Sequence, residues 1–516
     1  MSSMWRTPII LSSLLAIPGS GSAQYAGQAY GYTSNISGWI NSWRTLRQSS
    51  GYHFSDYAGL LIANPDWPDS AKLRRWAEKA MQPGENGMTV IAFFAHDKPR
   101  TGTGWARLAD ALSAAGRATE ALDAARNGWA SSDLSATDEQ AIWARYGGSF
   151  TTADHDRRTN ALLSAKNADD AARFVPISTP ARQAAFGARV QMLRNAADAD
   201  SRYQAVMGSV TSDAGLMMDR IRWLRANNLE QPARQLAART HNFVDRPADP
   251  ERFYELLSIL AANAAQDRQW STAFNIASQI DDVLAPGTRA ADQSLGIRDD
   301  YTTLAWLAGT VALDRLNRPS SALAMFDRYA SGGRSLQVLT KGTYWAGRAA
   351  LAAGQTQTAN AYFQRAAAYP DLFYGQLSLE RLGRSVPAPP QALAQYTTTA
   401  AQRAAFNSRP LMQAVRTLGQ QGRTAEQALF VRALAESLDT DSERNLAVEA
   451  SQQLRRPDLA VWTARAARIK GSEFYVRQAF PSLSGSVSPS LWSLAHAISR
   501  QESSFDPYAL SPAGAR

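Results

Sequence analysis

Apolar residues recur at helical spacing along most of the chain, from residue 34 to about residue 384. These segments are rich in Ala, Leu and Arg, and few of them show the apolar–polar alternation of a strand. Because apolar side chains three and four positions apart share one face of a helix, the pattern predicts an all-α protein. The same pattern returns from residue 391 to about residue 470.

Five turns between the predicted helices share one motif, which indicates a repeat. A Gly or Asn is followed five positions later by Ala, or once by Gln: Gly116 with Ala121, Asn228 with Ala233, Asn317 with Ala322, Gly354 with Ala359, and Gly422 with Gln427. Four turns have Ala or an aromatic residue at the ninth position: Ala125, Ala237, Phe326 and Phe363. Small residues there let two helices approach closely, as in tetratricopeptide-like repeats. The irregular intervals predict a degenerate α-superhelical solenoid.

Two stretches interrupt the helical pattern. Residues 385–390 read Ser-Val-Pro-Ala-Pro-Pro, and consecutive prolines cannot continue a helix, so we expect a linker there. Residues 471–487 contain Phe480-Pro481 and a loop rich in Ser and Gly. They predict a crossing to a separate C-terminal piece, residues 471–516.

The C-terminal piece contains the chemical signal of the chain. Ser488-Pro489 predicts a helix start and Asp506-Pro507 predicts its stop. Between them one apolar stripe recurs at helical spacing: Leu491, Leu494, Ala495, Ile498 and Phe505. Glu502 falls about 20° from Leu491, whereas His496 and Arg500 point away. We therefore expect Glu502 on the buried face at the C-terminal end of the helix, where desolvation and the helix dipole favour the protonated carboxyl that a general acid needs.

Residues 498–507 read Ile-Ser-Arg-Gln-Glu-Ser-Ser-Phe-Asp-Pro, and residues 511–515 read Ser-Pro-Ala-Gly-Ala. These two segments resemble the first catalytic motif of the soluble lytic murein transglycosylases. The resemblance implies that Glu502 is the catalytic acid and that Ser511 lies beside it in the cleft as a substrate-binding residue. Asp506, the other acid of the motif, lies at the edge of the stripe, and we interpret it as a helix-stop or structural residue.

The resemblance extends more weakly over the rest of the chain. Residues 64–68, 344–349 and 373–377 are similar to parts of the family's helical domain. The implied organisation is a ring- or U-shaped superhelical domain at residues 24–384, a helical linker domain at 391–470, and the start of a lysozyme-like domain at 471–516. Trp345 and Tyr374 are expected to pack between helices, or alternatively to face the central opening and stack on sugars.

The family motif continues with Gly-Leu-Met-Gln and further substrate-binding tyrosines, and this chain has neither before Arg516. We therefore expect a fragment that retains the catalytic acid, lacks part of the site and is inactive by itself.

The implied reaction cleaves the β-1,4 bond between N-acetylmuramic acid and N-acetylglucosamine of peptidoglycan and forms a 1,6-anhydro sugar. Glu502 would act first as acid and then as base, whereas an ordinary glycosidase pairs two carboxylates. The alternative is a non-catalytic periplasmic helical scaffold that binds glycan strands or protein partners.

Composition and the N-terminal residues indicate the cellular location and the class of ligand. Residues 1–23 contain Arg6, a short apolar run and the small residues Gly21-Ser22-Ala23, which together predict a signal peptide and export to the periplasm. The net charge of +9 becomes 9 − 1 = +8 without Arg6, which favours an anionic polymer, and we expect peptidoglycan rather than nucleic acid. The chain has no Cys and its five His are scattered, so we expect no metal and no cofactor, and no segment after the signal peptide is apolar enough to span a membrane.

Overall fold

A computed structural model of the protein describes residues 35–389, 397–483, 488–510 and 514. Over these residues the chain is all-α as expected, and its only β-type pairing is an isolated bridge between Asp213 and Asp245. The predicted signal peptide at residues 1–23 lies outside the described residues. In the part that is described, no helix combines the length and the apolar character that crossing a membrane requires.

The helices follow one another closely along the chain. The first group is α2 (Ile36–Leu46), α3 (Phe54–Ala63), α4 (Ser70–Ala80), α5 (Gly87–Phe94), α6 (Gly102–Ala114), α7 (Ala118–Trp129), α8 (Ala136–Tyr146), α9 (Thr152–Ser164), α10 (Ala168–Phe174), α11 (Pro180–Leu193) and α12 (Ala199–Gln204). The second is α13 (Ala214–Ala226), α14 (Glu230–Ala237), α15 (Pro250–Gln266), α16 (Trp270–Ala277), α17 (Leu295–Asp314), α18 (Pro319–Gly332), α19 (Leu336–Ala352), α20 (Thr356–Ala367) and α21 (Phe373–Arg381). The third is α22 (Ala400–Ser408), α23 (Pro410–Gln420), α24 (Thr424–Glu436), α25 (Asp441–Gln453), α26 (Pro457–Ile469) and α27 (Trp492–Glu502). Short 3₁₀ turns lie between some of them, among them η7 (Arg477–Ala479).

The five repeated turns each join two packed antiparallel helices, which confirms the solenoid. Their first residues all have left-handed backbone, with φ of 74°, 60°, 50°, 75° and 67° at Gly116, Asn228, Asn317, Gly354 and Gly422. This conformation costs little for Gly and Asn, which explains the motif. The alanines five positions later are 0–1% exposed: Ala121, Ala233, Ala322 and Ala359.

The ninth position is the point of close helix approach. A Cβ on Gly347 of α19 would lie 2.7 Å from the Phe363 ring of α20, and one on Gly309 of α17 would lie 2.6 Å from the Phe326 ring of α18. Aromatic rings therefore fill the space left by facing glycines. Gln427 departs from the alanine pattern, and its buried side chain donates to the Val415 carbonyl oxygen (3.0 Å) and accepts from Arg456 (3.0 Å).

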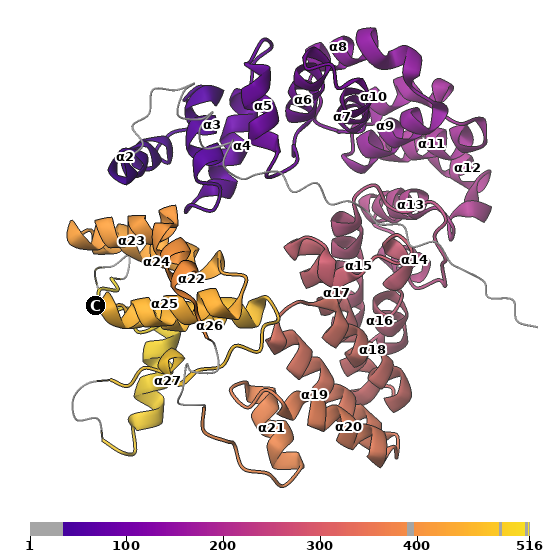
Figure 1. Cartoon of the computed structure of the whole chain (residues 1–516). Helices are drawn as coiled ribbons and strands as arrows, with labels where there is room; N and C mark the ends of the chain where they lie inside the picture. Colours follow the sequence, from indigo (N-terminus) through magenta and orange to yellow (C-terminus); the bar gives the residue numbers. More distant parts are fainter. Residues whose placement is uncertain (1–34, 390–396, 484–487, 511–513, 515–516) are drawn as a thin grey trace, which may run out of the picture.

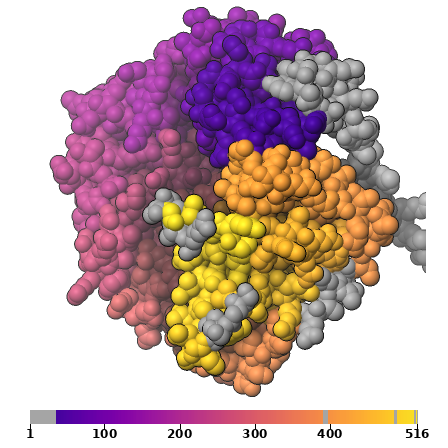
Figure 2. Space-filling model, turned by 90° about the vertical axis from the view of Figure 1, so that its left-hand side faces the viewer, coloured from indigo at the N-terminus to yellow at the C-terminus, as the bar shows by residue number. Residues whose placement is uncertain are grey.

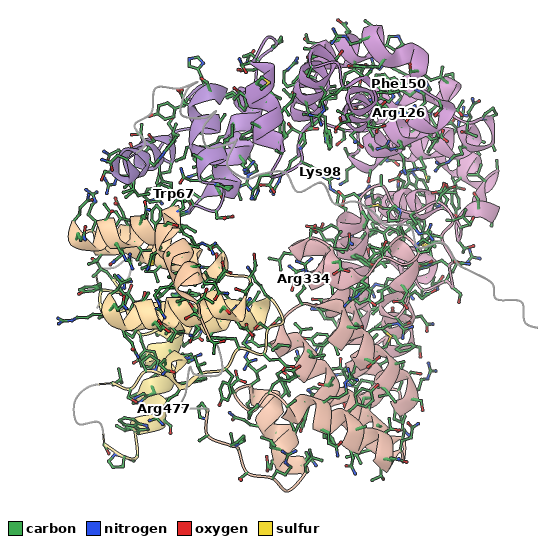
Figure 3. All side chains as sticks on the ribbon, viewed as in Figure 1. Trp67, Lys98, Arg126, Phe150, Arg334 and Arg477 are labelled. Atoms are coloured by element: carbon green, nitrogen blue, oxygen red, sulfur yellow. The ribbon has the colours of Figure 1, made fainter. Side chains whose placement is uncertain are left out.

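The helices are arranged as a ring (Figure 1), with α2–α5 at the upper left, α13–α20 down the right and α22–α26 at the left. Helices α2–α5 pack directly on helices α22–α26, and the two groups of helices share one hydrophobic core. Figure 2 shows this contact as indigo atoms lying on orange ones. The rings of Trp43 and Trp67 both meet Phe430 edge-on, with centroids 4.9 Å apart, and Trp67 marks this junction in Figure 3. Beside them Arg44 Nη2 lies 2.6 Å from Glu426 Oε2.

A second junction joins the far end of the solenoid to the end of α26. Arg468 holds Asp371 in a bidentate pair, Nε–Oδ2 and Nη2–Oδ1 both at 2.9 Å, and both side chains are 8% exposed. The Tyr369 hydroxyl donates to Glu473 (3.3 Å). The two pairs join residues 369–371 of the solenoid to residues 468–473 at the end of α26, about a hundred positions later. They therefore fix α26 against the solenoid, next to the C-terminal helix.

Trp345 and Tyr374 pack between helices, the first of the two expected roles. The Trp345 ring lies 5.5 Å from that of Trp306 and 5.8 Å from that of Phe326, and the Tyr374 ring lies 5.4 Å from that of Tyr344. The predicted linker has no regular structure over residues 385–389. The boundaries of the domains stay predictions.

Candidate active site at the end of the last helix

Helix α27 is shorter than the sequence predicts at both ends. Ser488-Pro489-Ser490 forms a turn, and the helix begins at Trp492 and ends at Glu502. The early stop arises because Ser504 and Phe505 have left-handed backbone, with φ of 54° and 63°. The Ser499 carbonyl oxygen accepts from the N–H groups of Ser503 and Phe505 (both 3.2 Å), which closes the last turn before Asp506-Pro507 is reached.

The face of α27 that docks on the protein is not the predicted one. Arg465 of α26 donates from Nη1 to the Ser504 hydroxyl (2.7 Å) and from Nη2 to the Arg500 carbonyl oxygen (2.6 Å). Arg500 in turn donates to the Ala479 carbonyl oxygen (2.6 Å). Arg500 lies off the apolar stripe, as predicted, but the prediction that the stripe is the buried face is wrong, because the side that carries Arg500 is the one that docks on neighbouring carbonyl and hydroxyl oxygens.

His496 is likewise off the stripe, as predicted, and it contacts the protein. Its Nε2 accepts from the Leu483 N–H (3.0 Å), its Nδ1 lies 2.8 Å from the Trp492 carbonyl oxygen, and its ring lies 3.9 Å from that of Trp492. The histidine thereby links the start of α27 to the segment that precedes it.

The predicted apolar stripe is present but uncovered. Leu491, Leu494 and Ile498 are 53%, 57% and 52% exposed. Glu502 continues that stripe and is exposed as well, and its carboxylate makes no hydrogen bond or ion pair with any described residue. The expectation of a buried Glu502 is wrong, because periodicity defines a stripe without saying whether anything packs on it. The carboxylate is instead open to a molecule from outside.

Asp506, the other acid of the motif, is held in place. Its Oδ2 lies 3.1 Å from Nη2 of Arg456, which also pairs with Asp458 (2.7 Å). The structure thus gives Asp506 a structural contact, in agreement with the expected role. Ser511 lies outside the described residues, so its place beside Glu502 stays a prediction.

A pocket of about 540 Å³ opens on the docked side of α27. Ala497, Arg500 and Gln501 form one wall, and the others come from α26, from residues 474–480 and from Gln337, Asp371 and Leu372 of the solenoid. Burial, and then the neighbouring Arg465, lower the pKa of Arg500 to about 10, and burial lowers the pKa of Arg465. Sequence reasoning missed this pocket, because its arginines come from two different helices, α26 and α27, and carry no periodic signal.

No group of three or more His, Asp and Glu side chains that could hold a metal occurs among the described residues. A scan of protein families finds no match to the sequence, and a search of curated proteins finds none either.

Solved structures include similar chains of low sequence identity. The 70 kDa soluble lytic transglycosylase Slt70 from Escherichia coli is 16% identical, with a TM-score of 0.46, over 94% of this chain and 75% of that one. The complex of the 70 kDa soluble lytic transglycosylase with bulgecin A is 17% identical in sequence, with a TM-score of 0.46, and the match covers 94% of this chain and 75% of that one. An inactive mutant of the lytic transglycosylase Slt from Pseudomonas aeruginosa is 15% identical, with a TM-score of 0.47, over 95% of this chain and 78% of that one. Because identities and scores are low, the function is inferred from the site itself.

Proposed function

We propose that the chain carries the catalytic acid of a lytic transglycosylase that cleaves the β-1,4 bond between N-acetylmuramic acid and N-acetylglucosamine in peptidoglycan. The observation that carries this proposal is the free carboxylate of Glu502 at the exposed end of α27, next to an Asp506 that is engaged by Arg456. The sequence around Glu502 resembles the family's first catalytic motif, and this resemblance indicates which reaction Glu502 would catalyse.

Glu502 would perform both proton transfers. As an acid it protonates the glycosidic oxygen, and the bond to the muramoyl C1 breaks. As a carboxylate it then takes the proton of the C6 hydroxyl, whose oxygen closes onto C1 to form the 1,6-anhydro product without water. A glycan lying over the end of α27 would take water away from the carboxylate and favour its protonated form. The exposed position of Glu502 permits this, since no described residue blocks it.

The position of Asp506 favours this route over hydrolysis. Retaining and inverting glycosidases require a second carboxylate that is free to act as nucleophile or base. The carboxylate of Asp506 is 3.1 Å from a buried guanidinium and is needed there. A single free carboxylate suits intramolecular attack by the C6 hydroxyl.

The proposed setting is the periplasm. Removal of residues 1–23 would leave Gln24 as the first residue and a net charge of +8, which suits peptidoglycan strands with their lactyl and peptide carboxylates. N-terminal sequencing of the exported protein should find Gln24 or a near neighbour, and an intact Met1 on a membrane-bound form would contradict export by cleavage.

The central experiment compares wild type and Glu502→Gln on purified peptidoglycan. Two forms are assayed, the 516-residue chain and the chain continued through any coding sequence that follows codon 516. We expect the 516-residue form to be folded and inactive, because no described residue encloses a sugar at Glu502. In an active extended form Glu502→Gln should lower turnover by about 10⁴-fold or more, since one residue serves as acid and base.

The products identify the reaction. Mass spectrometry should show muropeptides one water lighter than lysozyme products, without a reducing end. Reducing-end products would contradict the transglycosylase assignment, and near-normal activity of Glu502→Gln would contradict the assignment of the acid.

The second candidate function is a non-catalytic periplasmic scaffold, which the uncovered apolar face of Leu491, Leu494 and Ile498 favours. Peptidoglycan or protein binding without lysis by either form would support it. Lysis that depends on Glu502 would exclude it.

A further inference from the structure

The pocket behind α27 has an unbalanced charge. Three guanidinium groups line it, those of Arg465, Arg468 and Arg500, together with one carboxylate, that of Asp371, so the net charge of its walls is 3 − 1 = +2. Arg468 and Asp371 neutralise each other in their bidentate pair. The excess belongs to Arg465 and Arg500.

Neither of these two arginines forms an ion pair among the described residues. Their hydrogen bonds go to neutral oxygens only, those of Ser504, Arg500 and Ala479. Asp371 acts on Arg500 electrostatically, but its carboxylate is already held by Arg468.

Two adjacent, partly buried guanidinium groups that form no ion pair are costly. Burial lowers the pKa of both, and the neighbouring Arg465 lowers that of Arg500 further, to about 10, although Asp371 opposes this shift. The group nevertheless stays charged at neutral pH. A buried charge without compensation calls for an explanation, and an anion from outside would supply one.

The remaining walls suit an organic ligand. Each guanidinium lies over an aromatic ring: Arg465 over Trp462 at 5.3 Å, Arg468 over Tyr475 at 5.7 Å and Arg500 over Phe480 at 4.7 Å. The rings make flat apolar walls next to the charges, and about 540 Å³ falls within the usual range of small-molecule sites.

We propose that this pocket binds a small organic carboxylate, whose two oxygens accept hydrogen bonds from Arg465 and Arg500 and whose body lies against Trp462 and Phe480. The Nε atoms of both arginines and Nη2 of Arg500 have no acceptor among the described residues. Three free nitrogens match the two oxygens of a carboxylate better than the four oxygens of phosphate. Gln501 lines the pocket, whereas the next residue, Glu502, does not line it. The choice of an acidic sugar as probe rests on the proposed function, whereas the anion site itself does not.

The test is calorimetry on the 516-residue chain with a matched pair of sugars. N-acetylmuramic acid carries a lactyl carboxylate that N-acetylglucosamine lacks, so we expect binding of the first and none of the second. Arg500→Gln and Arg465→Gln should each weaken binding about 10- to 100-fold, because each removes charge-assisted hydrogen bonds. Arg477→Gln is the control, since Arg477 is exposed on η7 next to the pocket without lining it (Figure 3).

Three results would overturn the proposal: equal affinity for both sugars, affinity unchanged in Arg500→Gln and Arg465→Gln, or binding of inorganic phosphate without binding of the acid sugar. Arg500→Lys guards against misfolding, since it keeps the charge and should retain part of the affinity. Glu502→Gln should bind the acid sugar as wild type does, whether or not it loses lysis. A failure of the pocket and a failure of the proposed reaction are thereby separate results.

Discussion

Arg456 Nη2 and Asp506 Oδ2 lie 3.1 Å apart, and this contact ties the segment after Glu502 to α26. The Arg456 side chain is 1% exposed and that of Asp506 is 11% exposed. Arg456 also holds Asp458 and Gln427, so one buried guanidinium joins three separate segments. The position of the proposed catalytic segment thus depends on a residue about fifty positions before it.

Asp506→Asn should therefore lower stability without abolishing chemistry. Arg456 keeps its pair with Asp458, so we expect a loss of only about 1 kcal/mol in the free energy of unfolding. Hydrogen exchange of residues 503–510 should become faster. Asp439→Asn is the control, since it removes a solvent-exposed pair with Lys470. An effect no larger than that of the control would contradict a structural role for Asp506.

Part of this site could be predicted from sequence and part could not. The turns at Gly116 and Gly354 were predictable because left-handed backbone selects glycine locally. The stripe of α27 was predictable for the same local reason. The sequence did not predict which face of α27 is buried, because that depends on contacts with Arg465 and Ala479 in other segments. A ring or U shape was implied by the family resemblance alone, because the contacts that close the ring join residues 382 apart and leave no local pattern.

Ring closure should depend on Phe430. Its side chain is fully buried between Trp43 and Trp67, and truncation would leave a cavity at the junction. Phe430→Ala should cost about 3–5 kcal/mol and increase the radius of gyration measured by X-ray scattering. Phe363→Ala removes an equally buried ring within the solenoid, and it should destabilise the protein without opening the ring. Equal expansion of the two variants would contradict the closure.

The same junction should respond to acid through Glu426. Burial alone would raise the pKa of this carboxyl, but hydrogen bonds from Arg44 and Arg423 outweigh it and hold the pKa below its usual value. A lowered folded-state pKa contributes stability that is present above about pH 4.5 and is lost as pH falls through the folded-state value. Glu426→Gln should thus cost about 1 kcal/mol at pH 7, and the cost should shrink as the pH is lowered below about 4.5, measured by urea unfolding. A cost independent of pH would contradict the pair.

Asp300 in α17 should have the opposite effect on stability. Burial, followed by the nearby Asp299, Glu251 and Glu255, raises the pKa of Asp300 to about 6. Because the folded state holds this proton more tightly than the unfolded state, stability falls as pH rises from about 4 to about 6, and the full cost applies above that. Asp300→Asn removes the charge, so it should stabilise the protein by about 1 kcal/mol at pH 7.5 once solvent screening is allowed for. At pH 4 the wild-type carboxyl is already neutral, and the variant should then gain almost nothing. Unfolding curves of both proteins at the two pH values decide this, and an equal gain at both would show that packing rather than charge is responsible.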